Sequence, residues 1–210
     1  MPAIALTFDD GPNTVTTPQV LNLLEKEGIT ATFFLIAQNI TPESAAVVRR
    51  ARKMGCEIEN HSVTHAQMDK MSADEIRREV GDCTEKIREV LGEEPIFFRP
   101  PYIAVSQTLY DTVELGMICG VGCEDWVPEV TAEQRVTRVL DSAEDGQIVL
   151  LHDSEGNQNT VEALKTMIPE LKRRGYKFLT VSELFKEKNT VARHGWLYSN
   201  VLQENADNHL

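Results

Sequence analysis

The stretch "IALTFDDGP", residues 4–12, runs a short apolar segment into two adjacent carboxylates and then into a Gly-Pro turn. The apolar run predicts a strand that ends at Asp9. Two neighbouring anions repel each other, and folding does not require the pair. We therefore predict that Asp10 binds a metal ion while Asp9 stays free to handle a proton. The alternative is a pair of capping aspartates at a turn, which Gly11 permits and Pro12 stiffens.

Apolar runs alternate with amphipathic stretches from one end of the chain to the other. Near-continuous apolar strands in this alternation predict a mainly parallel sheet covered by helices, and the steady repetition favours a barrel over an open sheet. Besides the first strand, strands are predicted at residues 30–36, 56–60, 96–100, 117–123, 147–153 and 176–181. Helices are predicted at residues 18–28, 42–55, 72–92 (with a capping box from Ser72 to Glu75), 106–115, 132–145 and 160–175, with a short one from Ser182.

The composition of the 210 residues, 41% of them hydrophobic, predicts one domain that spans residues 1–210. Lys and Arg number 21 against 33 Asp and Glu, and the net charge of −12 argues against nucleic acid and anionic membranes as partners. Solubility alone is an alternative explanation of this charge. No run reaches the roughly 20 apolar residues of a membrane span. The four scattered cysteines are expected to be buried rather than joined in disulfides.

The start of the chain leaves the localisation open. Met1 is followed directly by Pro2 and the first predicted strand, without a secretory leader. We expect a cytoplasmic protein if the chain is complete, and an extracellular one if it is a catalytic module of a longer exported chain. Residues 187–210 form a more polar C-terminal extension, but residues 195–202 carry enough apolar side chains to dock on the domain.

Polar residues follow five of the predicted strands. Reactive groups of parallel α/β folds collect at the carboxyl ends of the strands, so these side chains are expected to lie together. Stability alone does not explain why five separate strands end in this way. The residues are Asp9, Asp10, His61, His65, Arg99, Asp125, Trp126, His152 and Asp153.

The segment "HSVTH", residues 61–65, is a candidate pair of metal ligands. Three intervening residues let the imidazoles of His61 and His65 converge on one ion if the segment turns. The pattern alone is weak, because exposed or core histidines also occur in pairs. Asp10 would add an anionic oxygen, and three protein ligands leave coordination positions open for water and substrate, which is typical of a catalytic site.

Asp9 and His152 are the candidates for proton transfer, and three further residues are candidate partners of these two. A nearby dication lowers the pKa of bound water from about 15.7 toward about 7, and Asp9 would then take its proton. His152 is the candidate general acid, with Asp125 as the partner that raises its pKa and Asp153 as the alternative partner. Arg99 would orient Asp9 through a charge-assisted hydrogen bond; the alternative is a surface cation beside two prolines.

Five blocks in this order resemble the polysaccharide deacetylases with a NodB homology domain, carbohydrate esterase family 4. They are "TFDDGP" (7–12), "HSVTH" (61–65), "RPPY" (99–102), "EDW" (124–126) and "LLHD" (150–153). The match covers about residues 3–186 and implies a distorted, incomplete (β/α) barrel, here of about seven parallel strands surrounded by helices. It also implies one divalent metal ion, with zinc expected and cobalt or nickel as alternatives.

The resemblance implies a role for each matching residue. Asp10, His61 and His65 look like the metal ligands, and Asp9 looks like the base that Arg99 orients. The other assignments are His152 as the acid tuned by Asp125, the Tyr102 backbone N–H as an oxyanion donor, and Trp126 and Leu151 as apolar walls for the acetyl methyl group.

The implied function is metal-dependent hydrolysis of acetyl groups from a carbohydrate. "RPPYIAV" and "GCEDW" look most like the acetylxylan esterase members, so O-deacetylation of acetylxylan is expected. Gly122 and Ile103 depart from the family pattern, in which Asp and Gly are frequent at these positions. The alternatives are N-deacetylation of a GlcNAc polymer (chitooligosaccharide or peptidoglycan), a non-catalytic carbohydrate-binding protein and a small-molecule amidohydrolase. The expected partner is an acetylated carbohydrate, and the oligomeric state stays open.

Overall fold

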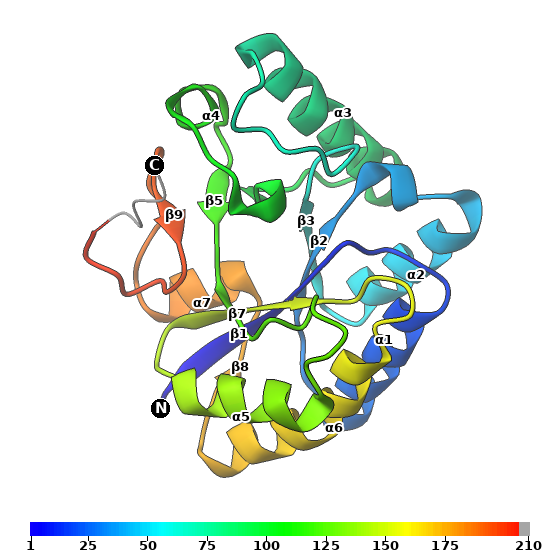
Figure 1. The fold of residues 1–210 in the computed structure, drawn as a ribbon, viewed down its shortest axis with the longest axis vertical. Helices are drawn as coiled ribbons and strands as arrows, with labels where there is room; N and C mark the ends of the chain where they lie inside the picture. The colour runs from blue at the N-terminus through cyan, green and yellow to red at the C-terminus, as the bar shows by residue number, and fades with distance from the viewer. Residues whose placement is uncertain (206–210) are drawn as a thin grey trace.

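Nine strands form one sheet in residues 1–205, the part of the chain that the computed structural model describes (Figure 1). The sheet runs in the order β6-β7-β1-β2-β3-β4-β5-β9, and β8 pairs with β1. All pairings between named strands are parallel. The strands are β1 (Ala3–Asp9), β2 (Thr32–Leu35), β3 (Glu57–Asn60), β4 (Phe97–Phe98), β5 (Gly116–Ile118), β6 (Val121–Gly122), β7 (Gln147–His152), β8 (Lys177–Phe178) and β9 (Leu197–Tyr198).

Seven α-helices in the described residues surround this sheet, as the alternating sequence pattern predicts (Figure 1). Ser72 caps the third helix, and Glu75 completes the predicted capping box. Two short 3₁₀ helices, η1 (Ala37–Asn39) and η2 (Pro101–Ile103), follow β2 and β4. The α-helices are α1 (Thr16–Glu27), α2 (Pro42–Lys53), α3 (Ala73–Leu91), α4 (Gln107–Thr112), α5 (Ala132–Ser142), α6 (Gln158–Arg173) and α7 (Val181–Glu187).

Strand β1 shows how the core positions the polar residues. Ile4, Leu6 and Phe8 pack with the helices in the largest apolar cluster, whereas Ala3 and Ala5 belong to a second cluster on the other face of the strand. Side chains alternate along a strand, so Asp9 faces the same side as Ala3 and Ala5, which is the inside of the barrel. The small alanines leave room there for the larger side chains of neighbouring strands.

The barrel is incomplete as expected, but its last strands differ from the predicted ones. "MICGVGC" (117–123) is not one strand: Cys119 and Gly120 separate β5 from β6, which pair with opposite ends of the sheet. The chain crosses from one end of the sheet to the other at this point. A Cβ atom on Gly120 would lie 3.1 Å from Nη2 of Arg99, and Gly120 has a φ of +88°, so glycine fits this crossing.

The C-terminal extension pairs with strands near both ends of the sheet. β9 pairs with β5, and Asn200 forms an antiparallel bridge with Gln147 of β7. Leu197, Tyr198 and Val201 are buried, which confirms that the apolar residues of this segment dock on the domain. The split strand and β9 raise the number of strands from the expected seven to nine.

Two further expectations concern the membrane and the cysteines. Within residues 1–205, no helix combines the length and the apolar character that crossing a bilayer requires. All four cysteines are buried, as expected for small apolar side chains.

Candidate functional site

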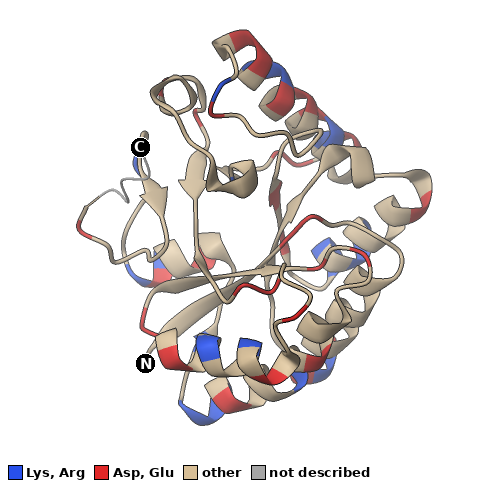
Figure 2. Ribbon diagram, viewed as in Figure 1, with Lys and Arg blue, Asp and Glu red and all other residues tan. Residues whose placement is uncertain are grey.

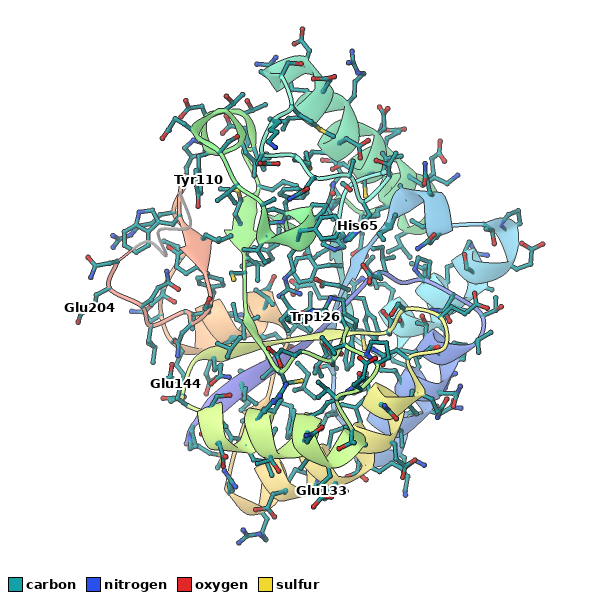
Figure 3. All side chains as sticks on the ribbon, in the orientation of Figure 1. His65, Tyr110, Trp126, Glu133, Glu144 and Glu204 are labelled. Atoms are coloured by element: carbon teal, nitrogen blue, oxygen red, sulfur yellow. The ribbon has the colours of Figure 1, made fainter. Side chains whose placement is uncertain are left out.

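A cavity of about 470 Å³ opens at the carboxyl ends of the strands. Figure 3 shows His65 and Trp126, which come from distant segments of the chain, near the centre of the view where these ends meet. Acidic positions gather in the loops at the centre of the same view in Figure 2. Of the nine residues expected to lie together, those that line the cavity are Asp9, Asp10, His61, His65, Trp126 and His152.

Asp10, His61 and His65 form a potential metal site. One ligand atom from each lies within 4.8 Å of the other two, and no other such group of three His, Cys, Asp or Glu residues occurs in residues 1–205. Oδ1 of Asp10 lies 3.7 Å from Nε2 of His61 and 3.4 Å from Nε2 of His65. This oxygen is buried and has no hydrogen-bond partner. A buried carboxylate oxygen without a donor fits a cation, because burial without any partner is unfavourable.

The orientation of His61 also suits a metal ligand. Its Nδ1 lies 2.7 Å from the backbone oxygen of Arg99, and a carbonyl oxygen can only accept a hydrogen bond. Nδ1 therefore carries the proton, and Nε2 directs its lone pair toward Asp10 and His65. Burial lowers the pKa of His61 despite the nearby Asp9 and Asp10, which favours the neutral form that binds metals.

Asp9 has one restrained oxygen and one that faces the site. Its Oδ1 accepts a hydrogen bond of 2.5 Å from Nη1 of Arg99, and its Oδ2 lies 3.7 Å from Nε2 of His61. Arg99 is fully buried and stacks over Phe34, so it bonds to Asp9 as predicted and the alternative of a surface cation does not hold. Burial alone would raise the pKa of Asp9, but the charge of Arg99 lowers it below its ordinary value. Asp9 is therefore an ionised acceptor at neutral pH.

His152 lies beside Asp9 because β1 and β7 pair these two residues. Nδ1 of His152 donates to Oδ1 of Asp125 over 2.8 Å, and its backbone N–H donates to Oδ2 over 2.7 Å. Burial would lower the pKa of His152, but the hydrogen bond and charge of Asp125 raise it to about 9. Asp125, and not Asp153, is thus the partner of His152. The imidazolium holds a proton at neutral pH.

Asp153 supports the turn after β1 instead. Its side chain accepts a hydrogen bond from the Thr17 hydroxyl, and its carboxyl group lies against Gly11. A Cβ atom on Gly11 would lie 2.8 Å from both carboxyl oxygens of Asp153, so glycine is needed here for space. The left-handed conformation in this turn falls on Asp10, with a φ of 74°, and not on Gly11.

Positive φ angles cluster around the site. Of the seven non-glycine residues with positive φ in residues 1–205, six are site residues or neighbours of one, and they include Tyr102 at 58° and Ile103 at 52°. Such angles are costly for side chains with a Cβ atom, most of all for a β-branched residue. The backbone strain is concentrated where the strands deliver the polar groups. The six are Asp10, Ser62, His65, Tyr102, Ile103 and Glu124.

The apolar side of the cavity differs from the expected one at a single residue. Leu150 lines the cavity, whereas Leu151 is fully buried in the main core, where it pairs with Phe8 of β1. Alternation along β7 explains this, because residues two apart share a face and His152 therefore shares its face with Leu150. The same alternation is visible in the sequence and could have located Leu150.

Two exposed aromatic side chains flank the polar groups. The Tyr102 ring lies 4.6 Å from the His65 ring, and the Trp126 ring lies 5.6 Å from the His152 ring, measured between centroids. Tyr102 is 67% exposed and Trp126 is 56% exposed, so both offer ring faces to a ligand. The two departures from the family pattern also lie here. Ile103 and Gly122 line the cavity, and a Cβ atom on Gly122 would lie 3.1 Å from the Trp126 ring.

Comparison with known proteins identifies the family. Residues 1–118 match the model of the family described as polysaccharide deacetylase. A bifunctional xylanase/deacetylase of Pseudobutyrivibrio xylanivorans is 51% identical over 88% of this chain and 31% of its own length. The peptidoglycan-N-acetylglucosamine deacetylase PgdA of Listeria monocytogenes is 35% identical over 90% of this chain and 40% of its own length. The chain thus spans less than half the length of these two relatives.

A solved structure shares the fold closely. The family 4 acetyl xylan esterase from Clostridium thermocellum, in complex with a cobalt ion, superposes with a TM-score of 0.93 at 41% identity. The match covers 96% of this chain and all of that one. A cobalt ion in this relative and the Asp10-His61-His65 group here support a divalent metal ion. The chain belongs to the polysaccharide deacetylases of carbohydrate esterase family 4.

Proposed function

We propose that this chain hydrolyses acetyl groups on a carbohydrate with the help of one divalent metal ion. The observation that carries this is the position of two opposite proton-transfer groups beside the Asp10-His61-His65 group. Asp9 is ionised and directs one oxygen toward that group, whereas the pKa of His152 is raised to about 9, so it holds a proton. Hydrolysis of an acyl group needs such a pair, a base for the attacking water and an acid for the leaving group.

A bound divalent ion would be held by Asp10, His61 and His65, and it would polarise the acetyl carbonyl and lower the pKa of water. The other roles belong to the chain itself. Asp9 takes a proton from the attacking water while Arg99 holds its other oxygen in place. His152 gives its proton to the departing sugar oxygen, and the charge of Asp125 stabilises the imidazolium form of His152.

The backbone around Tyr102 suits stabilisation of the oxyanion. The left-handed angles at Tyr102 and Ile103 turn the chain beside His65, and Tyr102 lines the cavity. We assign its backbone N–H to the developing negative charge, because preorganised donors at that position are typically the largest catalytic contribution. Leu150 and Trp126 take the role of the apolar walls around the acetyl methyl group, with Leu150 in place of the Leu151 that the family resemblance implied.

Acetylated xylan is the substrate that we propose, with removal of O-acetyl groups as the reaction. Support comes from the similarity of the chain to a bifunctional xylanase/deacetylase, at 51% identity, and to an acetyl xylan esterase, at 41% identity. N-deacetylation of a GlcNAc polymer is the second candidate, which the 35% identity to a peptidoglycan deacetylase favours. Ester and amide hydrolysis pass through similar tetrahedral intermediates, so the same groups can serve both reactions. An alkoxide leaves more readily than an amide nitrogen, so the ester demands less of His152.

Zinc is the metal that we propose, because one carboxylate and two imidazoles suit zinc and leave open positions. The test is to remove metal with a chelator and to measure acetate release from acetylated xylan, chitooligosaccharide and a small acetyl ester. Activity should disappear and return with zinc or cobalt. His61→Ala should lose metal affinity, measured by calorimetry, while it keeps its circular dichroism spectrum. Full activity in protein verified to be metal-free would refute the mechanism, and release only from chitooligosaccharide would refute the xylan substrate.

A further inference from the structure

Arg135 of α5 is an arginine buried inside the protein, with only 1% of its surface exposed. A buried cation is costly unless it is paired, yet Arg135 forms no ion pair with any residue in 1–205. Its guanidinium donates only to neutral acceptors. They are the backbone oxygens of Val130 (3.0 Å) and Val127 (3.2 Å), Oδ1 of Asn157 (2.6 Å) and the hydroxyl of Thr160 (2.8 Å).

The contact with Thr160 points toward the site. A guanidinium can only donate, so the Thr160 oxygen must accept from Arg135 and must direct its single proton elsewhere. That proton goes to Oδ2 of Asp125, 2.8 Å away. Asp125 thus accepts from the Thr160 hydroxyl and from both the ring and the backbone N–H of His152. Arg135 lies one hydroxyl away from the carboxylate that carries the opposite charge.

The contact with Asn157 also links Arg135 to the Asp125–His152 pair. Because Arg135 takes the amide oxygen of Asn157, the amide nitrogen is left to donate. It donates to the backbone oxygens of Asp125 (3.2 Å) and His152 (3.0 Å). One guanidinium thereby sets the orientation of two side chains, each of which bonds to the Asp125–His152 pair.

The two carbonyl contacts hold the loop that carries this pair. Val127 and Val130 lie between Asp125 and the start of α5, so Arg135 fixes the loop from beneath while Thr160 and Asn157 fix it from α6 and its approach. Arg138, one turn further along α5, also donates to this loop, at the backbone oxygen of Cys123, and pairs with Glu124. Arg138 does not touch Thr160 or Asn157 in the described structure. It is a natural control for loop anchoring alone.

We infer that Arg135 is a positioning residue for acid catalysis, which aligns Asp125 and His152 through Thr160 and Asn157. This inference rests on the proposed acetyl hydrolysis, in which His152 protonates the leaving group. An aryl oxide departs without a proton, whereas a sugar alkoxide needs one. Loss of the alignment should therefore slow hydrolysis of a sugar ester far more than hydrolysis of an aryl ester.

The experiment compares Arg135→Met, Thr160→Val, Thr160→Ser and Arg138→Met in the metal-loaded protein. The measured quantity is kcat/KM for an acetylated xylooligosaccharide and for 4-nitrophenyl acetate. Arg135→Met and Thr160→Val should lose on the order of 10²-fold on the sugar ester, the lower end of general acid catalysis, and much less on the aryl ester. Thr160→Ser keeps the hydroxyl and should retain activity, and Arg138→Met should leave both rates unchanged.

A second measurement does not depend on turnover. The proton on Nδ1 of His152 should give a downfield NMR signal in the wild type, and this signal should shift or disappear in Arg135→Met and Thr160→Val. If Arg135→Met does not fold, Thr160→Val carries the test. An equal loss of kcat/KM on both esters would show that Arg135 only anchors the loop, and so would a loss in Arg138→Met as large as in Arg135→Met. Either result would overturn the inference. Failure of the proposed function looks different, since the wild type would then release no acetate from either ester.

Discussion

Both ends of the barrel bury acidic side chains, but the two ends differ in the hydrogen-bond donors that these side chains find. At the carboxyl ends of the strands, buried side-chain atoms of Asp10, Arg99 and Asp153 have no hydrogen-bond partner. No other buried side-chain nitrogen or oxygen in residues 1–205 lacks one. Near the amino ends, Glu57 and Glu59 of β3 also face the inside of the barrel and line a cavity of about 330 Å³. Both oxygens of Glu57 and Oε2 of Glu59 have hydrogen-bond donors.

The fold itself supplies hydrogen-bond donors to Glu57 and Glu59. Glu59 accepts hydrogen bonds from the backbone N–H groups of Ile96 (2.8 Å) and Phe97 (2.7 Å). Glu57 accepts from the hydroxyl of Thr32 (2.9 Å) and from the hydroxyl and backbone N–H of Ser182. These bonds tie β3 to β2, β4 and α7. Glu57 and Glu59 therefore serve the structure, whereas Oδ1 of Asp10 at the carboxyl end has no donor, which fits a metal ligand.

The largest expected effect tests this contrast directly. Asp9→Asn should lower kcat for acetate release by roughly 10²–10⁴-fold, because the base for water is lost, while metal affinity remains. The matched change at the other end, Glu59→Gln, also turns a buried carboxyl group into an amide and should leave the rate unchanged. An unaffected rate in Asp9→Asn would mean that another group acts as the base. A comparable loss of rate in Glu59→Gln would contradict the purely structural role of Glu59.

An intermediate effect is expected on stability at the turn after β1. Gly11→Ala would place a Cβ atom 2.8 Å from the buried carboxyl oxygens of Asp153 and should lower the free energy of unfolding by about 1–3 kcal/mol. Gly81→Ala is the control, because Gly81 lies within α3 with nothing within 4 Å and should gain about 0.5–1 kcal/mol. Urea unfolding measures both changes. Equal effects would show that the Asp153 carboxyl group moves away at little cost.

The smallest effect is a pH dependence at the amino end. Burial, and then the charge of Glu57, raise the pKa of Glu59 well above its ordinary value. The folded state thus keeps a proton that the unfolded chain has already lost, and stability falls as the pH rises toward the folded-state pKa. Glu59→Gln should flatten this decline by at most about 1.4 kcal/mol per pH unit, measured by urea unfolding from about pH 5 to pH 8. An unchanged slope would contradict the raised pKa.

Much of the site was predictable, because it depends on residue type at strand ends. Asp9, Asp10, His61 and His152 each lie at or directly after the last residue of a strand, and parallel strands bring their carboxyl ends together. The error at Leu151 was avoidable, since counting back two residues from His152 leads to Leu150. The split of residues 117–123 was not, because it depends on where the two ends of the sheet lie relative to each other.

Arg135 shows most clearly what local pattern cannot reveal. In the sequence it is a charged residue of an amphipathic helix, where the default expectation is a solvated face. The structure buries it beneath the loop after β6, with acceptors from residues 127, 130, 157 and 160 around its guanidinium. Those acceptors meet only when α5 and α6 pack side by side.

The sequence by itself determined the alternation of strands and helices, the polar residues at the strand ends and the family to which they belong. Periodicity and residue chemistry are local, so they can be read along the chain. Tertiary structure alone decided that Arg99 reaches Asp9 across 90 residues, that Asp10 keeps an oxygen without a donor, and that the left-handed turn falls on Asp10 rather than on Gly11. Those outcomes follow from burial and from distances between remote segments, and neither exists until the barrel has formed.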